Sequence, residues 1–213
     1  MGHERIDFDV FPEIIDVGRR MEEAKLVNTS EGNISIKRDG LVYITPSRHS
    51  KRTLTKEIIA VINEAGQQIW GSMKPSSETP MHLAAYGIHP GTNAVIHCHA
   101  PYLTAHAICN KSIKLDCHPE LLCHLKDIPC APYGRPGTED ILDKAREALK
   151  DRYLVLLGNH GVLAVASSLE KCFARVETAE SIARLMTIVA QVGEPVPLPA
   201  DELERYSHFQ PTL

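Results

Sequence analysis

Residues 94–100 read Ala-Val-Ile-His-Cys-His-Ala, so an apolar run leads directly into two histidines, His97 and His99. Alternate side chains of a β-strand project from the same face of a sheet, and this spacing therefore predicts a strand that presents two imidazoles side by side. Two further segments are candidates to complete a site: Ser-Ser-Glu at 76–78, and Gly-Asn-His-Gly at 158–161, where a second apolar run ends in a turn. Three imidazoles and one carboxylate form a donor set that suits Zn²⁺ or a similar divalent cation.

The composition predicts a single domain. The chain has 213 residues, of which 43% are hydrophobic, which is enough for one sizeable core, and no linker rich in Pro, Gly or Ser divides it. We therefore expect one domain over residues 1–213, with a core of about 11–191 and a C-terminal tail over 194–213. The formal net charge of -4 gives no electrostatic reason to expect a nucleic-acid partner.

Cysteine usage and hydropathy predict a cytoplasmic protein. The six cysteines form no Cys-x-x-Cys pair, and the first residues contain no apolar segment like that of a signal peptide. No apolar stretch approaches the length of a membrane span. We therefore expect a reducing compartment and no membrane partner.

Helical and strand periodicities alternate along the chain. The Asp-Gly pair at 39–40 separates two short apolar runs, which is typical of a β-hairpin. The expected strands are 33–37, 41–45, 58–62, 67–70, 95–99, 153–157 and 162–166. The expected helices are 11–26, 79–86 (with Thr79 as N-cap and Pro80 as first residue), 101–109, 139–149 and 169–191, and residues 110–137 are expected to be mostly irregular. Strands paired by tight turns, with helices between them, predict helices packed on a mainly antiparallel sheet.

Six segments together resemble the class II aldolase/adducin family, and they occur in the family's order. The segments are EGNISI (31–36), YITPS (43–47), PSSE (75–78), HLAAY (82–86), VIHCHAPYLTAHA (95–107) and LLGNHGVLA (156–164). The resemblance implies an α/β fold of three α/β/α layers with a central, mostly antiparallel (mixed) sheet. It also implies a homotetramer with active sites at the subunit interfaces.

The same resemblance implies the ligands of the metal and of the substrate. It places Glu78, His97, His99 and His160 on one Zn²⁺ per subunit, with Mn²⁺ or Co²⁺ left open. The residues that it places around the substrate phosphate are Gly32, Asn33, Ser35, Thr45, Pro46, Ser47, Ser76 and Ser77. One departure from the family is Arg48, which stands where Gly usually follows Thr-Pro-Ser. Of the other histidines, His82 and His106 are interpreted as helix residues and His3, His49, His89 and His208 as surface residues, while His118 and His124 stay open.

The function that the resemblance implies is that of a zinc-dependent class II aldehyde-lyase. Such an aldolase would cleave a phosphorylated ketose, such as L-fuculose 1-phosphate, into dihydroxyacetone phosphate and an aldehyde through a metal-stabilised enediolate. Glu78 would act as the acid/base group, and Tyr133 and Tyr206 are the candidate proton donors to the departing aldehyde.

Other activities of the family use the same shared motifs and stay open. A dehydratase of the methylthioribulose-1-phosphate type would need a further base, for which Glu120 or His118 is available. An L-ribulose-5-phosphate 4-epimerase would need an Asp that has no clear match before residue 127. A non-enzymatic, adducin-like scaffold is the least expected reading, because all four metal-ligand residues are present.

Overall fold

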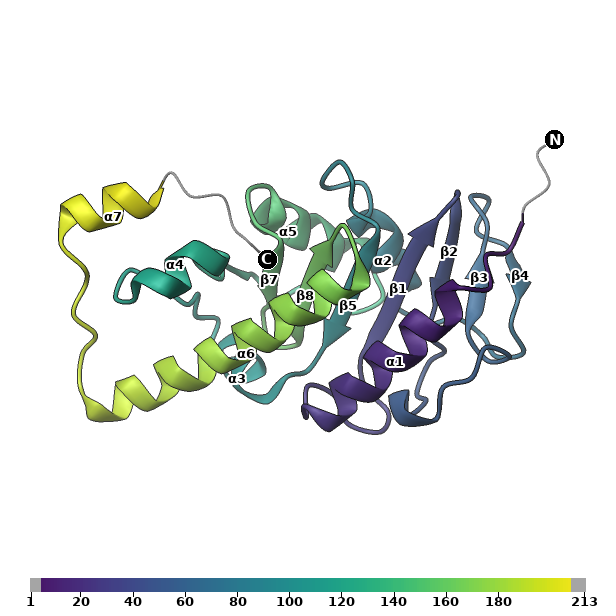
Figure 1. The fold of residues 1–213 in the computed structure, drawn as a ribbon, viewed down its shortest axis with the longest axis horizontal. Coiled ribbons are helices and arrows are strands. Elements are labelled where there is room, and N and C mark those ends of the chain that lie inside the picture. The colour runs from purple at the N-terminus through teal and green to yellow at the C-terminus, as the bar shows by residue number, and fades with distance from the viewer. Residues whose placement is uncertain (1–4, 208–213) are drawn as a thin grey trace.

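An eight-stranded sheet forms the middle layer of the computed structural model, which describes residues 5–207 without the side chains of 120, 121, 124, 139, 142 and 207. The strand order is β4-β3-β2-β1-β5-β8-β7-β6 (Figure 1). Neighbouring strands are antiparallel except for β6 and β7, which are parallel. The strands are β1 Asn33–Arg38, β2 Leu41–Ile44, β3 Ala60–Ile62, β4 Gln68–Trp70, β5 Ala94–Cys98, β6 Cys130–Ala131, β7 Leu154–Leu157 and β8 Gly161–Ala166.

Helices cover both faces of the sheet, and strand alternation decides which side chains meet them. On one face Ile34, Ile96 and Ala164 belong to a core shared with α1, α3 and α6. On the other face Val95 and Leu163 pack with residues of α2 and α5. The helices are α1 Val10–Glu23, α2 Thr79–Ala85, α3 Pro101–Ile108, α4 Pro119–Leu125, α5 Glu139–Leu149, α6 Leu169–Val192 and α7 Ala200–Ser207, with a 3₁₀ turn over Lys51–Thr53. The expected three-layer α/β/α fold with a mixed, mostly antiparallel sheet is confirmed.

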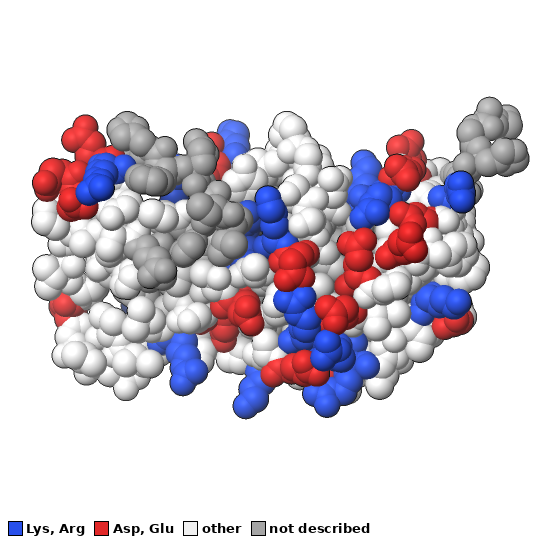
Figure 2. Space-filling view, in the orientation of Figure 1, with Lys and Arg blue, Asp and Glu red and all other residues white. Residues whose placement is uncertain are grey.

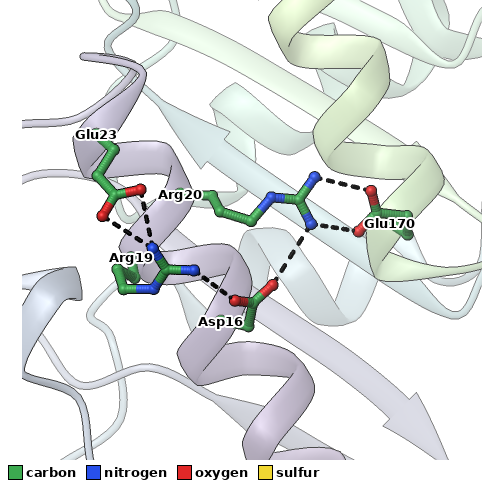
Figure 3. A network of polar contacts seen from close by, with 5 residues as sticks. All are labelled: Asp16, Arg19, Arg20, Glu23 and Glu170. Carbon is green, nitrogen blue, oxygen red and sulfur yellow. Dashed lines mark hydrogen bonds and ion pairs between the residues drawn. The ribbon is translucent and has the colours of Figure 1, made fainter.

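An ion-pair network joins α1 to α6 on the outer side of the first core (Figure 3). The guanidinium of Arg20 donates to both carboxylate oxygens of Glu170, at 2.6 and 2.8 Å, and stands 4.3 Å from the ring centre of Phe173. Asp16 bridges Arg20 to its neighbour Arg19. The hydrogen bond from Arg20 is the main reason why the pKa of Glu170 is lowered. These contacts link the two helices at the surface of the molecule.

The expected elements that carry their own local signals are present. Asp39 and Gly40 have φ angles of 52° and 79°, as a type I′ hairpin requires, and they join β1 to β2. The helix expected over 139–149 is α5, with the same bounds. In α2 the N-cap is Glu78 and Thr79 is the first helical residue, one position earlier than expected.

Three elements were not expected. Residues 110–137 are mostly irregular, as expected, but they contain α4 and the short edge strand β6, and the C-terminal tail contains α7. The helix α7 packs on α4, and the Leu198 amide donates to the Asp116 carbonyl at 2.8 Å. Tertiary contacts of this kind order segments that have no strong local signal. None of the helices within residues 5–207 has both the length and the apolar character needed to cross a bilayer.

Candidate metal centre

Three histidine rings meet where β5 ends and β7 turns into β8. His97 lies inside β5, His99 follows it by two positions, and His160 occupies the turn before β8. The ring centres of the three pairs are 4.7 to 5.1 Å apart. One candidate ligand atom from each ring lies within 4.8 Å of the other two. The geometry is therefore that of a group that converges on one point.

The hydrogen-bond pattern of these rings fits a metal. His97 Nδ1 lies 2.9 Å from the carbonyl oxygen of Val162, which only accepts, so Nδ1 carries the proton and Nε2 keeps its lone pair. Within the described residues, His97 Nε2, His99 Nε2 and His160 Nδ1 are buried and have no hydrogen-bond partner. Buried polar atoms without partners are costly, and a cation at the point where the rings meet would satisfy His97 Nε2 and His99 Nε2. Burial also lowers the pKa of His97 and His160, which keeps both rings neutral, as metal ligands must be.

Glu78 completes the group from the other side. Its carboxylate oxygens lie 3.3 Å from His97 Nε2 and 3.5 Å from His160 Nε2, and its side chain is only 16% exposed. Asn33 donates to Glu78 Oε2 at 2.8 Å. The structure thus brings all four expected ligand residues together. A carboxylate that the sequence analysis did not single out, Glu31, lies 3.5 Å from Nδ1 of His99.

Close backbone packing explains the glycine that follows His160. A Cβ atom on Gly161 would lie 2.5 Å from the carbonyl oxygen of Cys98 and 2.6 Å from Cδ2 of His99. Asn159, which precedes His160, has a φ of 57°, a conformation that Asn tolerates better than most residues. This turn therefore places the third histidine against the end of β5.

Two loops lie side by side next to Glu78. Pro46 pairs with Pro75 in an isolated antiparallel bridge, and the Ser76 amide donates to the Thr45 carbonyl at 3.2 Å. The Ser77 amide donates to the hydroxyl of Ser47 at 2.9 Å. These contacts gather hydroxyl and amide groups beside the candidate metal centre. The loop residue Gly32, which precedes Asn33, has a φ of 71°.

Two of the residues expected around a phosphate have their hydroxyls engaged inside the fold. Ser35 is fully buried, and its Oγ lies between His82 and Tyr86. Thr45 is also fully buried, and its Oγ1 accepts from the amide of Ile34 at 3.1 Å. The side chain of Ser35 points at α2 rather than at the loops, and its contact with a substrate phosphate stays a prediction.

The remaining candidates lie at the edges of this region. Arg48 is exposed, has a φ of 53° in the region that glycine favours, and makes no hydrogen bond or ion pair with the described residues. Tyr133 is 52% exposed in the loop after β6, and no polar contact in residues 5–207 joins it to the histidines. Tyr206 belongs to α7, which packs on α4. His118 is the N-cap of α4, and the side chain of Glu120 lies outside the described part.

Residues 12–187 match the family model described as Class II Aldolase and Adducin N-terminal domain. The match spans most of the chain, so the protein belongs to this family, whose class II aldolases depend on a metal. A solved structure of L-fuculose 1-phosphate aldolase is 33% identical in sequence and has a TM-score of 0.88 over 97% of this chain and 98% of that one.

Relatives of known function are similar over most of their length. The chain is 36% identical to 5-deoxy-D-ribulose 1-phosphate aldolase of Bacillus thuringiensis, over 90% of this chain and 91% of that protein. It is 35% identical to L-fuculose phosphate aldolase of Escherichia coli K12, over 89% of this chain and 88% of that protein. It is 32% identical to the 5-methylthioribulose-1-phosphate/5-deoxyribulose-1-phosphate aldolase of Escherichia coli O45:K1, over 87% and 86%.

Proposed function

We propose that the protein is a zinc-dependent aldolase that cleaves a ketose 1-phosphate, such as L-fuculose 1-phosphate, into dihydroxyacetone phosphate and an aldehyde. The observation that carries this proposal is the convergence of His97, His99 and His160 with the carboxylate of Glu78, beside loops rich in hydroxyl and amide groups. One wall of the site would hold a divalent cation, and the other would hold a phosphate.

The named relatives support a ketose 1-phosphate as substrate. The names of the two deoxyribulose 1-phosphate aldolases above, and that of the solved L-fuculose 1-phosphate aldolase, all specify a ketose with its phosphate on carbon 1. Cleavage between carbons 3 and 4 of any such sugar gives dihydroxyacetone phosphate, and only the aldehyde differs. The parts of the site that bind the phosphate and the reacting carbons are therefore expected to be shared, whereas the aldehyde is set by other residues.

Glu78 is the proposed acid/base group. The net reaction moves one proton from the hydroxyl on carbon 4 to carbon 3 while the bond between these carbons breaks. Glu78 would deliver the proton to carbon 3, since its carboxylate lies against the histidines and its side chain is mostly shielded from water. A zinc ion held by His97, His99 and His160 would supply Lewis-acid stabilisation of the negative charge on the three-carbon fragment. Tyr133 and Tyr206 stay candidates for the group that handles the carbon 4 hydroxyl proton.

The phosphate would be bound largely by neutral donors. Ser47, Ser76 and Ser77 lie on the two paired loops, and hydrogen bonds from such groups to a dianion are charge-assisted. Asn33 uses one amide hydrogen on Glu78 and has a second one for a ligand. Arg48 is the cation that follows directly on these loops, and it has no carboxylate partner in the described chain.

We also propose that the protein forms a homotetramer with sites at its interfaces. The C-terminal half of α6 has a largely uncharged surface, whereas charged residues gather over α1 (Figure 2). Leu185, Ile188 and Val192 on α6 are 42%, 47% and 85% exposed, and their spacing places them on one face of the helix. Contact with another subunit would bury this apolar face, and sedimentation would test the assembly.

The test is a panel of ketose 1-phosphates, together with L-ribulose 5-phosphate, given to purified zinc-loaded protein. Dihydroxyacetone phosphate is followed in a coupled assay, and all products by NMR. We expect dihydroxyacetone phosphate to form from a ketose 1-phosphate, and we expect Glu78→Gln to lower the rate of its formation by about 100-fold or more. The matched control is Glu147→Gln, because Glu147 is 78% exposed on α5 and, among the described residues, its carboxylate pairs only with Lys150.

Two results would contradict the aldolase. If the carbon skeleton stays whole while a hydroxyl is lost or inverted, the same site catalyses dehydration or epimerisation. If no sugar phosphate reacts although the protein binds zinc, the chain is a scaffold rather than an enzyme.

A further inference from the structure

A chain of buried hydrogen bonds leads from Glu78 into the space between β1 and α2. Asn33 donates from Nδ2 to Glu78 at 2.8 Å, and Oδ1 of the same amide contacts His82 Nε2. On the other side of its ring, His82 Nδ1 lies 2.7 Å from the hydroxyl of Ser35, which lies 2.5 Å from the hydroxyl of Tyr86. Both His82 and Ser35 are fully buried.

The carboxylate at one end sets the direction of every hydrogen bond in this chain. An ionised Glu78 only accepts, so Asn33 must turn its NH₂ group toward it and its carbonyl oxygen toward His82. That oxygen also only accepts, so Nε2 of His82 must carry a proton. Burial lowers the pKa of His82 to about 3, so the ring is neutral at pH 7 and Nδ1 keeps a lone pair.

The rest of the chain follows from that tautomer. Ser35 must donate its hydroxyl proton to His82 Nδ1, and its oxygen then accepts from Tyr86. All the donors point from Tyr86 toward Glu78. Aligned hydrogen bonds in a buried chain polarise one another, and the orientation of each group depends on the next.

We propose that His82, held by Ser35 and Tyr86, is a positioning residue that fixes the Asn33 amide and, through it, the Glu78 carboxylate. A proton on Nε2 of His82 prevents the Asn33 amide from flipping, because the flipped amide would place NH₂ against N–H and oxygen against the carboxylate. The importance of Glu78 for catalysis rests on the proposed function, but the positioning itself concerns only the residues of this chain.

The first test is the tautomer of His82 in metal-free protein. Histidine labelled with ¹⁵N is observed by NMR, and the His82 signals are assigned by their loss in His82→Gln. We expect a neutral ring with the proton on Nε2 throughout the range from about pH 5 to pH 8, well above its lowered pKa. A proton on Nδ1, or an imidazolium ring at pH 7, would overturn the proposal.

The second test is Co²⁺ binding by variants of His82, followed by the visible absorption spectrum of the bound ion. Removing a partner that orients a ligand typically costs between 10-fold and 100-fold in metal affinity, and we expect about a 10-fold loss for His82→Leu. His82→Gln keeps an N–H near the position of Nε2, so we expect an affinity and a spectrum close to those of the wild type. Tyr86→Phe should lower the Co²⁺ affinity less than His82→Leu does, because Ser35 still donates to His82.

Two outcomes separate positioning from simple stability. Equal loss of affinity in His82→Leu and His82→Gln, with cooperative unfolding of both, would contradict the proposal, because the N–H would then be irrelevant. Neither the tautomer nor the Co²⁺ affinity requires turnover. A failure to cleave any ketose 1-phosphate would therefore contradict the proposed function without changing either result.

Discussion

Gly161→Ala is a sharp test of how tightly the candidate metal centre is packed. The added Cβ would stand 2.6 Å from Cδ2 of His99 and 2.5 Å from the carbonyl oxygen of Cys98. Contacts between carbon atoms normally lie at roughly 3.5–4.0 Å, so a displacement of about 1 Å is needed. The Cys98 carbonyl belongs to β5, whose pairing with Val162 of β8 holds it in place. Relief of the contact with the Cys98 carbonyl therefore needs a shift of the backbone at Gly161, and relief of the other contact needs the ring of His99 to move.

Both stability and metal binding should fall. Overpacking of a close-packed site costs about 1–3 kcal/mol. Taking about 2 kcal/mol, a chain of this size should lose about 4–8 °C in Tm. Displacement of His99 should also lower the zinc content measured after dialysis. The assay is thermal unfolding with and without a chelator, together with metal analysis of the same samples.

The matched control is Gly193→Ala at the end of α6. No atom lies within 4 Å of a Cβ built there, and the φ of 163° is extended backbone that any residue adopts. We expect a Tm within about 2 °C of the wild type and full zinc content. If Gly161→Ala behaves like this control, the close approach of β8 to His99 does not constrain the site and the reasoning is refuted.

Three further predictions concern other parts of the molecule. Glu170→Gln breaks the pair with Arg20, but the carboxylate is 65% exposed, so we expect the free energy of unfolding to fall by no more than about 1 kcal/mol. Thermal unfolding should show this difference at low salt and no difference at high salt. The pKa of His82 is lowered from 6.5 to about 3, so as the pH drops the unfolded chain binds the proton before the folded protein does. The free energy of unfolding should therefore fall by up to about 1.4 kcal/mol per pH unit below about pH 6.5. Urea unfolding at several pH values should show this fall in the wild type and not in His82→Gln, and the same pH dependence in both would contradict the prediction. Burial raises the pKa of Cys98 to about 12, so iodoacetamide should label exposed Cys109 and leave Cys98 unmodified in native protein, as mass spectrometry of the labelled peptides would show.

Local signals explain why much of the fold was predictable. The Asp39-Gly40 turn needs two residues with positive φ, and this dipeptide is among the few that supply them readily. The helix over 139–149 is amphipathic, and its apolar residues recur at the helical period, which is visible in the sequence. The spacing of His97 and His99 likewise needs only strand alternation to bring the rings together.

The elements that were not predicted depend on contacts distant in the sequence. The helix α4 has seven residues, too few to be stable alone, and it packs against α7 and α6. The strand β6 consists of two residues paired in parallel with β7 at the edge of the sheet. Neither element is long enough to show a periodicity that would separate it from irregular chain.

The role of Ser35 can be recognised only when β1 is known to pack against α2, although the sequence of each element shows which of its residues share a face. Asn33 and Ser35 share one face of β1 by alternation, and Glu78, His82 and Tyr86 share one face of α2 by their spacing of four. The register of β1 with β5 sets Asn33 opposite His97, at the metal centre. Ser35 then lies two positions further from His97, under α2.

The register of β1 with β5 also decides which side chains of β1 lie at the candidate metal centre and which lie inside the fold. A residue on β1 can reach the candidate centre only if it lies at the end of the strand where His97 lies, and Asn33 meets this condition while Ser35 does not. A phosphate is therefore left to the loops at 45–47 and 75–78, whose amides and hydroxyls already hold each other in place. Since the donors on those loops, Ser47, Ser76 and Ser77, are neutral, the charge of Arg48 should make phosphate affinity depend on salt. Arg48→Gly should raise KM and weaken that dependence while leaving kcat nearly unchanged. An unchanged KM would mean that the guanidinium points away from the substrate.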